Sequence, residues 1–311
     1  EIAKVADSIT VLRDGATVET MDCRNQPISE DRIIRGMVGR DMAHRYPQRH
    51  PKIGDTVFEV RDWRVHHALH ADREQIKGVN LHVRQGEIVG IAGLMGAGRT
   101  ELAMSVFGKS YGQRISGTVL MHGKPVDVGT VRKAIDQGIA YVTEDRKGLG
   151  LVLEENIQKN VSLANLEAVS SSMVIDDARE FKVASDYRKA LNIRSSGVEQ
   201  LVVNLSGGNQ QKVVLSKWLF TKPELLILDE PTRGIDVGAK YEIYTIIDQL
   251  ASEGKGILMI SSELPELLGM CDRIYVMNEG RFVAEFTAAE ASQERIMHAI
   301  VSAGSSVHVP A

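Results

Sequence analysis

A glycine-rich segment at residues 93–100, GLMGAGRT, carries residue types that can bind phosphate. It fits the pattern G-x-x-x-x-G-K-[ST], except that Arg99 stands where the pattern has lysine. Glycines allow successive backbone N–H groups to face a phosphate, and the helix N-terminus beneath them is the positive end of a dipole. The segment predicts a phosphate site formed by Gly93, Gly96, Ala97, Gly98, Arg99 and Thr100. The Thr100 hydroxyl would also bind Mg²⁺, whereas a tight strand–helix turn without a ligand is the alternative.

Arg99 is the unusual member of this segment. Its guanidinium is a wide, planar donor, whereas the lysine of such loops acts as a compact point charge between the β- and γ-phosphates. We expect nucleotide binding to survive this exchange and hydrolysis at this site to be impaired.

Two carboxylates end the apolar run LLILDE at residues 225–230. At the carboxyl end of a parallel strand, such a pair faces the ligand crevice of the sheet. Asp229 would hold Mg²⁺ through water, and Glu230 would polarise the attacking water as a general base. A strand that simply ends in a solvated charged turn is the alternative.

A third segment, LSGGNQQ at residues 205–211, precedes a helical pattern and comes before the acidic pair. Ser206 followed by two glycines at a helix start presents a hydroxyl and free N–H groups, which form a second anion site. A plain Ser-Gly-Gly helix cap is the alternative.

These three segments, in this order, resemble the nucleotide-binding domain of ATP-binding cassette (ABC) proteins over about residues 56–290. The resemblance implies an α/β fold of the phosphate-loop NTPase class, with a mixed sheet core, an antiparallel β subdomain and a helical subdomain at about residues 150–215. It also implies ATP and Mg²⁺ as cofactors, and two cassettes that face each other head to tail. In that arrangement a set of signature residues would close in trans over the ATP of a first, twin cassette: Ser206, Gly207, Gly208 and Gln210.

Three positions depart from the family pattern. Arg99 replaces the lysine, Glu144 replaces a glutamine that binds Mg²⁺, and Ser262 replaces a histidine that contacts the γ-phosphate. The contacts at this chain's own nucleotide are therefore expected to be altered, whereas the LSGG that acts in trans is intact. His67 stands where an adenine-stacking aromatic is expected, which leaves the nucleotide preference open.

The segments GLMGAGRTEL, YVTEDRKGLGL and SSELPELLG resemble the second cassette of monosaccharide-importer ATPases of the ribose, galactose, xylose and multiple-sugar type. This resemblance implies peripheral attachment to membrane permease subunits at the cytoplasmic face of a bacterial inner membrane. It also implies an indirect link to a periplasmic sugar-binding protein. A catalytically silent nucleotide-binding and coupling module, and a soluble ABC protein outside transport, are the alternatives.

Strand and helix patterns alternate around these segments. Short buried strands are expected at residues 87–94, 139–145, 225–230 and 256–262. Helices are expected at residues 100–108, 212–220 and 239–254, and a polar helical insert from residue 154 to about residue 201. The alternation indicates a parallel α/β sheet with a helical insert in its middle.

The two ends of the chain repeat each other. Pairing Glu1 with Glu266 also matches Asp7 with Asp272, and each copy reads as a strand, a tight turn and a second strand. This favours duplicated modules over chance hairpins. We expect residues 1–40 to be the C-terminal tail of a first cassette, residues 41–54 a linker, residues 55–303 the second cassette, and residues 304–311 a disordered tail.

The composition limits the possible partners. The 311 residues carry a formal net charge of −4, so no global basic field attracts nucleic acid, and we expect no nucleic-acid partner. Two distant cysteines fit no metal spacing, and no apolar run approaches the ~20 residues of a membrane span. The basic residues Arg146 and Lys147 are expected to be solvated charges or contacts to acidic groups of a membrane subunit.

Overall fold

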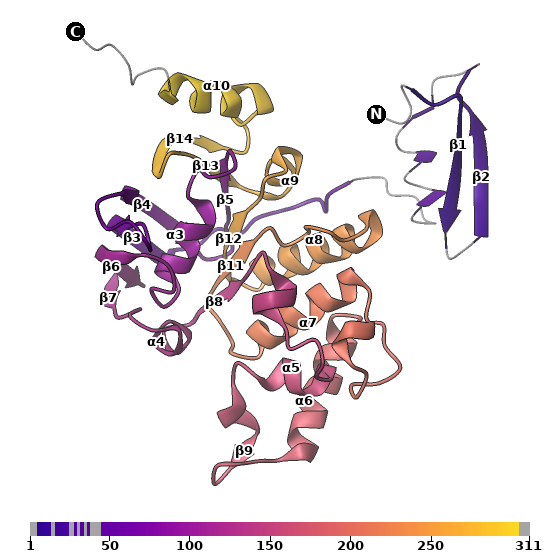
Figure 1. Ribbon diagram of the computed structural model, residues 1–311, viewed down its shortest axis with the longest axis horizontal. Coiled ribbons are helices and arrows are strands. Elements are labelled where there is room, and N and C mark those ends of the chain that lie inside the picture. The colour runs from indigo at the N-terminus through magenta and orange to yellow at the C-terminus, as the bar shows by residue number, and fades with distance from the viewer. Residues whose placement is uncertain are drawn as a thin grey trace.

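The computed structural model describes residues 5–13, 16–24, 28–29, 32–33, 36–37 and 45–304 (Figure 1). Outside these residues lie residues 305–311 of the expected tail and residues 41–44 of the expected linker. Among the described residues, no helix is both long and apolar enough to cross a bilayer.

A six-stranded sheet forms the centre of the cassette. Its strands lie in the order β14 (Arg281–Thr287), β13 (Arg273–Asn278), β5 (Ile88–Gly93), β12 (Gly256–Ile260), β11 (Leu225–Asp229) and β8 (Ile139–Val142). The strands from β13 to β8 are parallel, and β14 pairs antiparallel with β13. The four inner strands are short apolar runs that helices cover on both faces, so their side chains are almost completely buried.

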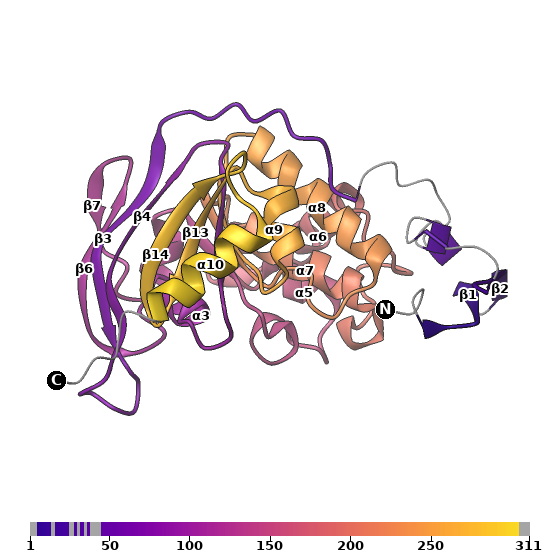
Figure 2. The same ribbon diagram turned by 90° about the horizontal axis from the view of Figure 1, so that it is seen from above.

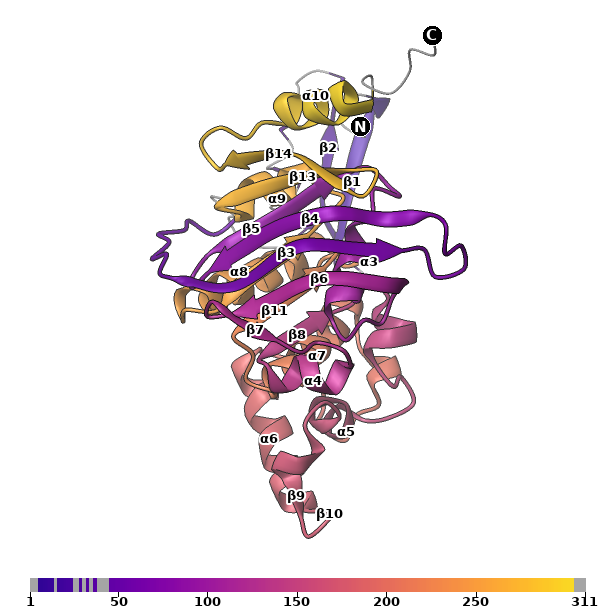
Figure 3. The same cartoon turned by 90° about the vertical axis from the view of Figure 1, so that its left-hand side faces the viewer.

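Helices and a second sheet pack around this centre. The helices next to it are α3 (Arg99–Val106), α4 (Val131–Asp136), α8 (Val237–Ser252), α9 (Leu264–Met270) and α10 (Gln293–Gly304). The second sheet is antiparallel, in the order β4 (Glu74–Arg84), β3 (Thr56–His66), β6 (Gln113–Met121) and β7 (Lys124–Val126). Figure 3 shows its strands side by side. β6 and β7 form a hairpin whose turn is His122-Gly123.

The helical insert lies beyond β8 (Figure 1). It contains the π-turn η1 (Arg146–Gly150), α5 (Ile157–Ser162), the 3₁₀ turn η2 (Leu166–Val169), the short strands β9 (Ser170–Ser171) and β10 (Val174–Ile175), α6 (Asp177–Ala190), the turn η3 (Val202–Asn204) and α7 (Gly207–Leu219). The small β9–β10 hairpin is absent from the sequence expectation because two-residue strands leave no periodic pattern. The expected mixed sheet, antiparallel subdomain and helical subdomain are confirmed.

The repeated ends of the chain have the same local structure. The hairpin of β1 (Ser8–Arg13) and β2 (Ala16–Asp22) pairs Ser8 with Asp22, as β13 and β14 pair Arg273 with Thr287. The alignment that pairs Glu1 with Glu266 superposes all four strand ends.

Both hairpins also contain the same irregularity. The register shifts between Val11 and Leu12 in the first and between Val276 and Met277 in the second, and these are equivalent positions of the repeat. A shared bulge is more specific than a shared hairpin, because bulges interrupt pairing at one defined place. The turn residues Asp14 and Gly15 lie outside the described residues.

Residues 45–54, here called the strap, run along the cassette (Figure 2). The ring of Tyr46 lies 5.2 Å from the ring of Tyr244 in α8 and packs on Gly269, where a Cβ would lie 2.2 Å from the tyrosine. Arg49 donates to Asp248 and to Asp272, each over 2.9 Å. This part of the expected linker is thus anchored to the cassette through Tyr46 and Arg49.

Candidate nucleotide-binding site

The phosphate loop connects β5 to α3, and the structure explains why each of its three glycine positions requires glycine. Gly98, which precedes α3, has φ +104°, and Gly96 has φ +81°, a region that other residues rarely adopt. A Cβ on Gly93 would lie 2.6 Å from the carbonyl oxygen of Met277. The loop thus keeps its backbone free of side chains where a phosphate would approach.

Arg99 turns from the start of α3 towards the end of β12. Its Nη1 donates to the carbonyl oxygen of Ser261 over 2.7 Å, and its Nη2 lies 3.8 Å from Oε1 of Glu230. Only 11% of the side chain is exposed. The guanidinium therefore contacts two protein groups at once, and the single ammonium of a lysine would not reproduce this geometry.

Asp229 ends β11 and is fully buried. Its Oδ2 accepts a hydrogen bond from the Tyr141 hydroxyl over 2.9 Å, whereas no described residue donates to its Oδ1. Burial raises the pKa of Asp229, and the hydroxyls of Thr100 and Tyr141 oppose this rise. A buried carboxylate oxygen without a donor is a group that a Mg²⁺-bound water would satisfy, so the residues present fit a magnesium site.

Glu230 follows in a strained conformation, with φ 47°. Its backbone N–H donates to the carbonyl oxygen of Ile260, and its Oε2 accepts from the Ser262 hydroxyl over 3.1 Å. Burial raises the pKa of Glu230, and the Ser262 hydroxyl and the Arg99 charge act against this rise. The carboxylate of Glu230, the predicted general base, is therefore contacted by Ser262 and Arg99, two of the three positions that depart from the family pattern.

Glu144 lies beyond the end of β8 and forms an ion pair with Arg233. A pocket of about 430 Å³ opens beside this pair, lined by Thr100, Met104, Thr143, Glu144, Asp145, Leu149 and Arg233. The structure thus brings two of the three expected metal-binding side chains, Thr100 and Glu144, to one pocket, whose lining does not include Asp229.

The signature segment lies at the start of α7, away from the phosphate loop. Helix α7 packs on α5, β8 and α8, whereas α3 packs on β4, β5 and β11. Ser206 is exposed and does not cap its own helix; instead its Oγ accepts from Asn209 Nδ2 over 2.9 Å. The Ser206 hydroxyl therefore keeps its own hydrogen for an outside acceptor, and no side chain caps the first N–H groups of α7.

Gly208 and Gln210 have packing roles. A Cβ on Gly208 would lie 2.4 Å from Cβ of Ala239, so glycine allows α7 to approach α8. The Gln210 side chain is 5% exposed, and its Nε2 donates to the carbonyl oxygen of Val202 over 3.1 Å. In this chain the Gln210 amide therefore points into the helical subdomain, and its role at a partner's nucleotide stays a prediction.

Arg146 was expected to be either a solvated charge or a contact to acidic groups of a membrane subunit, and the first of these alternatives is wrong. It is partly buried and donates to the carbonyl oxygens of Arg233 and Gly234 over 2.7 and 3.1 Å. A Cβ on Gly207 would lie 3.0 Å from its Nη2. Arg146 thus connects η1 to the loop after β11 and to the signature helix, while Lys147 is exposed.

His67 follows β3, where an adenine-stacking residue was expected. Its Nδ1 accepts from the Leu69 N–H over 3.1 Å, and its ring lies 5.1 Å from that of His70 and 6.4 Å, edge-on, from that of Tyr111. The ring is thus part of a small aromatic group outside the second sheet.

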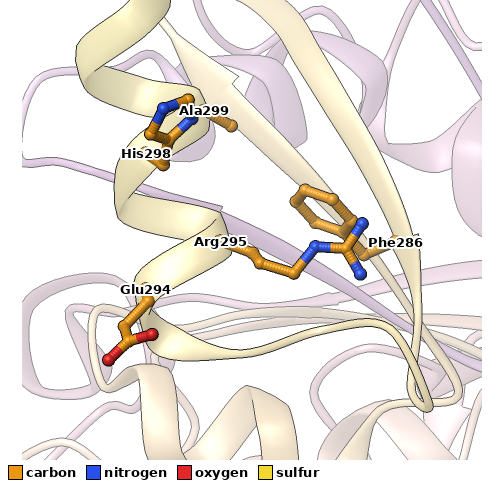
Figure 4. Close-up of a pocket in the computed structure, with 5 residues that line it drawn as sticks. All are labelled: Phe286, Glu294, Arg295, His298 and Ala299. Carbon is orange, nitrogen blue, oxygen red and sulfur yellow. The ribbon is translucent and has the colours of Figure 1, made fainter.

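A further hollow of about 450 Å³ lies between β14 and α10 (Figure 4). The Arg295 guanidinium covers the Phe286 ring there, with 4.9 Å between its Cζ and the ring centre. None of the predicted site residues lines this hollow. The chemistry is therefore concentrated at the carboxyl ends of β5, β8, β11 and β12.

A comparison with protein families decides what this arrangement represents. The family described as ABC transporter matches residues 76–233, from β4 to the loop after β11. The chain belongs to the ABC transporter family. Among solved structures, an ATP-binding cassette of an ABC transporter matches with a TM-score of 0.67 and 20% identity, covering 79% of this chain and 99% of that one. A cassette in its ADP conformation matches with a TM-score of 0.64 and 20% identity, over 80% and 98% of the two chains.

Curated ABC proteins are also similar to this cassette chain. The L-arabinose transport ATP-binding protein of Geobacillus stearothermophilus is 62% identical over 96% of this chain. The xylose import ATP-binding protein of Thermoanaerobacter pseudethanolicus and the ribose import ATP-binding protein of Bacillus cereus are 48% and 47% identical, each over 96% of the chain. The chain spans 58% of the length of each of these three relatives.

Proposed function

We propose that this chain is the nucleotide-binding part of a bacterial monosaccharide importer and that it works as one of two paired cassettes. Its own site holds nucleotide but turns it over slowly or not at all. Its signature residues Ser206, Gly207 and Gly208 complete the competent site of the twin. The observation that carries this proposal is the contrast between an own site whose Arg99 and Glu230 contact each other and a signature whose Ser206 is exposed and does not cap its helix.

The engagement of Glu230 gives the physical reason for slow turnover. A general base must be free to accept a proton from water. Here its carboxylate receives the Ser262 hydroxyl on one oxygen and faces the Arg99 guanidinium with the other. Both contacts oppose the rise that burial causes in the pKa of Glu230, and they occupy both oxygens that would receive a proton from water.

The remaining parts of the site support binding of Mg²⁺ and nucleotide phosphates. Gly93, Gly96, Ala97 and Gly98 would present the backbone N–H groups, and Thr100, Asp229 and Glu144 would hold Mg²⁺ directly or through water. The metal would neutralise phosphate charge when bound. Glu144 must leave its ion pair with Arg233 to take part.

We infer that the transported sugar is a pentose, with L-arabinose as the first candidate. The relative at 62% identity is named for L-arabinose, and the two at 48% and 47% are named for xylose and ribose. The cassette would attach to permease subunits at the cytoplasmic face of the membrane, and a periplasmic binding protein would deliver the sugar to those subunits. The hairpin β1–β2, which repeats β13–β14, would belong to the end of the first cassette.

Sugar uptake tests the transport proposal. The transporter that contains this chain is reconstituted in vesicles with its binding protein, and labelled L-arabinose uptake is measured with and without ATP, against unlabelled D-xylose, D-ribose and D-glucose. We expect ATP-dependent uptake that pentoses inhibit more strongly than glucose does. Uptake that does not require ATP, or inhibition by glucose alone, contradicts the proposal.

Steady-state hydrolysis tests the silent site. The purified chain is expected to bind MgATP without steady turnover, and Glu230→Gln is expected to leave this unchanged. Steady hydrolysis by the natural chain that disappears in Glu230→Gln would show that the site is competent.

A further inference from the structure

A buried carboxyl lies directly behind the altered site. Glu266, in α9, is 1% exposed, and both of its oxygens accept hydrogen bonds from buried hydroxyls. Oε1 accepts from Thr232 Oγ1 over 2.6 Å, and Oε2 accepts from Ser261 Oγ. No other element supplies a charged partner to this carboxyl among the described ion pairs. Such a residue is costly to bury, so its place needs a reason.

The Ser261 branch leads to Arg99. Ser261 is fully buried, and its carbonyl oxygen accepts the 2.7 Å hydrogen bond from Arg99 Nη1. Its Oγ also accepts from the Glu263 N–H over 3.0 Å, so this hydroxyl has one hydrogen to donate, and Glu266 takes it. The position of the Arg99 acceptor is thus fixed through Glu266.

The Thr232 branch leads to Glu230. Thr232 is 1% exposed and lies two residues after Glu230, in the turn that forces Glu230 to φ 47°. The N–H of Arg233 donates to the Glu230 carbonyl oxygen across the same turn. By holding Thr232, Glu266 holds the turn that aims the Glu230 carboxylate at Ser262 and Arg99.

We propose that Glu266 is a positioning residue for the nucleotide site, which sets the relative placement of Arg99 and Glu230 through Ser261 and Thr232. The proposal rests on the proposed function for its consequences in nucleotide binding, but its geometry is independent of it. The two oxygens of the Glu266 carboxyl link the end of β12 to the turn after β11. A γ-phosphate would lie between these two segments. The buried hydroxyl of Tyr244 also hydrogen-bonds to Glu266, and Tyr46 of the strap packs on the ring of Tyr244.

The first test measures geometry in the nucleotide-free chain. With ¹⁵N-labelled arginine, the hydrogen-bonded Nη1 of Arg99 is expected to give a signal that exchanges slowly with water, assigned by its absence in Arg99→Lys. In Glu266→Gln only the amide oxygen can accept, so one of the two hydroxyls loses its acceptor and the link between Ser261 and Thr232 is broken. We expect the Arg99 signal to broaden or disappear in Glu266→Gln and to persist in the control Glu263→Gln, whose carboxylate is exposed and pairs with Lys240. An unchanged signal in folded Glu266→Gln overturns the proposal.

The second test separates positioning from general stability. Thr232→Val keeps the shape of the side chain and removes its hydroxyl, whereas Thr232→Ser keeps the hydroxyl. We expect Thr232→Val and Glu266→Gln to weaken MgATP binding roughly fivefold and MgADP binding less than about twofold. Thr232→Ser is expected to behave as the natural chain.

The outcomes distinguish the two proposals. Equal losses for ATP and ADP, or equal effects of Thr232→Val and Thr232→Ser, indicate a merely structural role and overturn the positioning role. If the natural chain binds neither nucleotide, the proposed function fails, and the Arg99 signal alone then decides the role of Glu266.

Discussion

The phosphate-loop side and the signature side of this cassette are built on different principles. At the phosphate-loop side, charged side chains are tied to one another and to the backbone: Arg99 to Ser261 and Glu230, and Glu144 to Arg233. At the signature side, no side chain caps the start of α7, and Ser206, which precedes it, is exposed and accepts a hydrogen bond from Asn209. The charged side chains of one side are thus paired within the chain, whereas the proposed function assigns the hydroxyl of the other side to a partner.

The difference teaches where a change of sequence matters. A site made of side-chain charges can lose its chemistry by single replacements while the fold persists, and the proposed function assigns such an effect to the arginine at position 99. A site made of backbone N–H groups cannot be altered so easily, because only glycine and a small hydroxyl residue fit it. The two sides can therefore differ in competence within one fold.

The strongest way to break the comparison is Ser206→Arg. A long cation at the start of α7 fills the space of the approaching phosphate and removes the hydroxyl. In the assembled transporter we expect sugar-stimulated ATP hydrolysis to fall by about a hundredfold or more, as for loss of a donor to transition-state charge. Ser252→Arg, at the exposed end of α8, is the matched control and should leave hydrolysis unchanged. Full activity of Ser206→Arg would show that this signature completes no active site.

Arg99→Ala should have the opposite profile. Because this chain's own site contributes little turnover, we expect sugar-stimulated hydrolysis of the transporter to change by less than about threefold. MgATP affinity of the isolated chain should fall roughly tenfold, the effect of one charge-assisted hydrogen bond. Arg99→Lys should retain most of the affinity because it keeps the charge. If Arg99→Ala and Ser206→Arg damage hydrolysis equally, the assignment of the silent site is reversed.

One substitution in the strap can remove the contact between Tyr46 and Tyr244, which lies next to the phosphate-loop side. Tyr46→Ala removes the half-buried ring from the space between Tyr244 and Gly269, which should lower the unfolding free energy by about 1–3 kcal/mol and Tm by about 3–8 °C. Calorimetry measures this, and Tyr46→Phe, which keeps the ring, serves as the control. A Tm of Tyr46→Ala equal to that of the natural chain would mean that the strap does not stabilise the cassette.

Much of this molecule could be predicted from its sequence, and the reasons are local. The phosphate loop, the end of β11 and the start of α7 each combine a buried apolar run or helix start with glycines at fixed positions. Such signals depend on nearest neighbours along the chain and are read directly. The repeat of the two hairpins was visible for the same reason, down to strand ends that coincide with the structure.

What could not be predicted depends on contacts between distant segments. Gln210 looked like part of an exposed motif, but Val202 and the helical subdomain bury it. Arg146 looked solvated, but the loop after β11 supplies two carbonyl oxygens to it. Glu266 lies inside the recognised SSELPELLG segment, yet only the fold shows that its two oxygens meet Ser261 and Thr232. A single sequence carries the identity of these residues but not their partners.

The smallest expected effect concerns pH and again separates the two sides. Burial raises the pKa of Glu266 above its usual 4.5, against the hydrogen bonds from Ser261, Thr232 and Tyr244. The native state therefore holds a proton at pH values where the unfolded chain has lost it. The contribution of this proton to stability is fully present below the unfolded pKa and is lost as pH rises through the native pKa.

Glu266→Gln removes this titration, so its stability relative to the natural chain must depend on pH. As pH falls from about 7.5 to about 4.5, we expect the difference in Tm to move by about 1–3 °C in favour of the natural chain. Ser206→Ala, on the signature side, introduces and removes no titratable group, so its difference in Tm should stay constant over the same range. A parallel shift in both variants would mean that Glu266 is not the group responsible. A difference that moves in favour of Glu266→Gln as pH falls would mean that Glu266 is held as a carboxylate, stabilised by its three hydroxyl donors more than burial destabilises it.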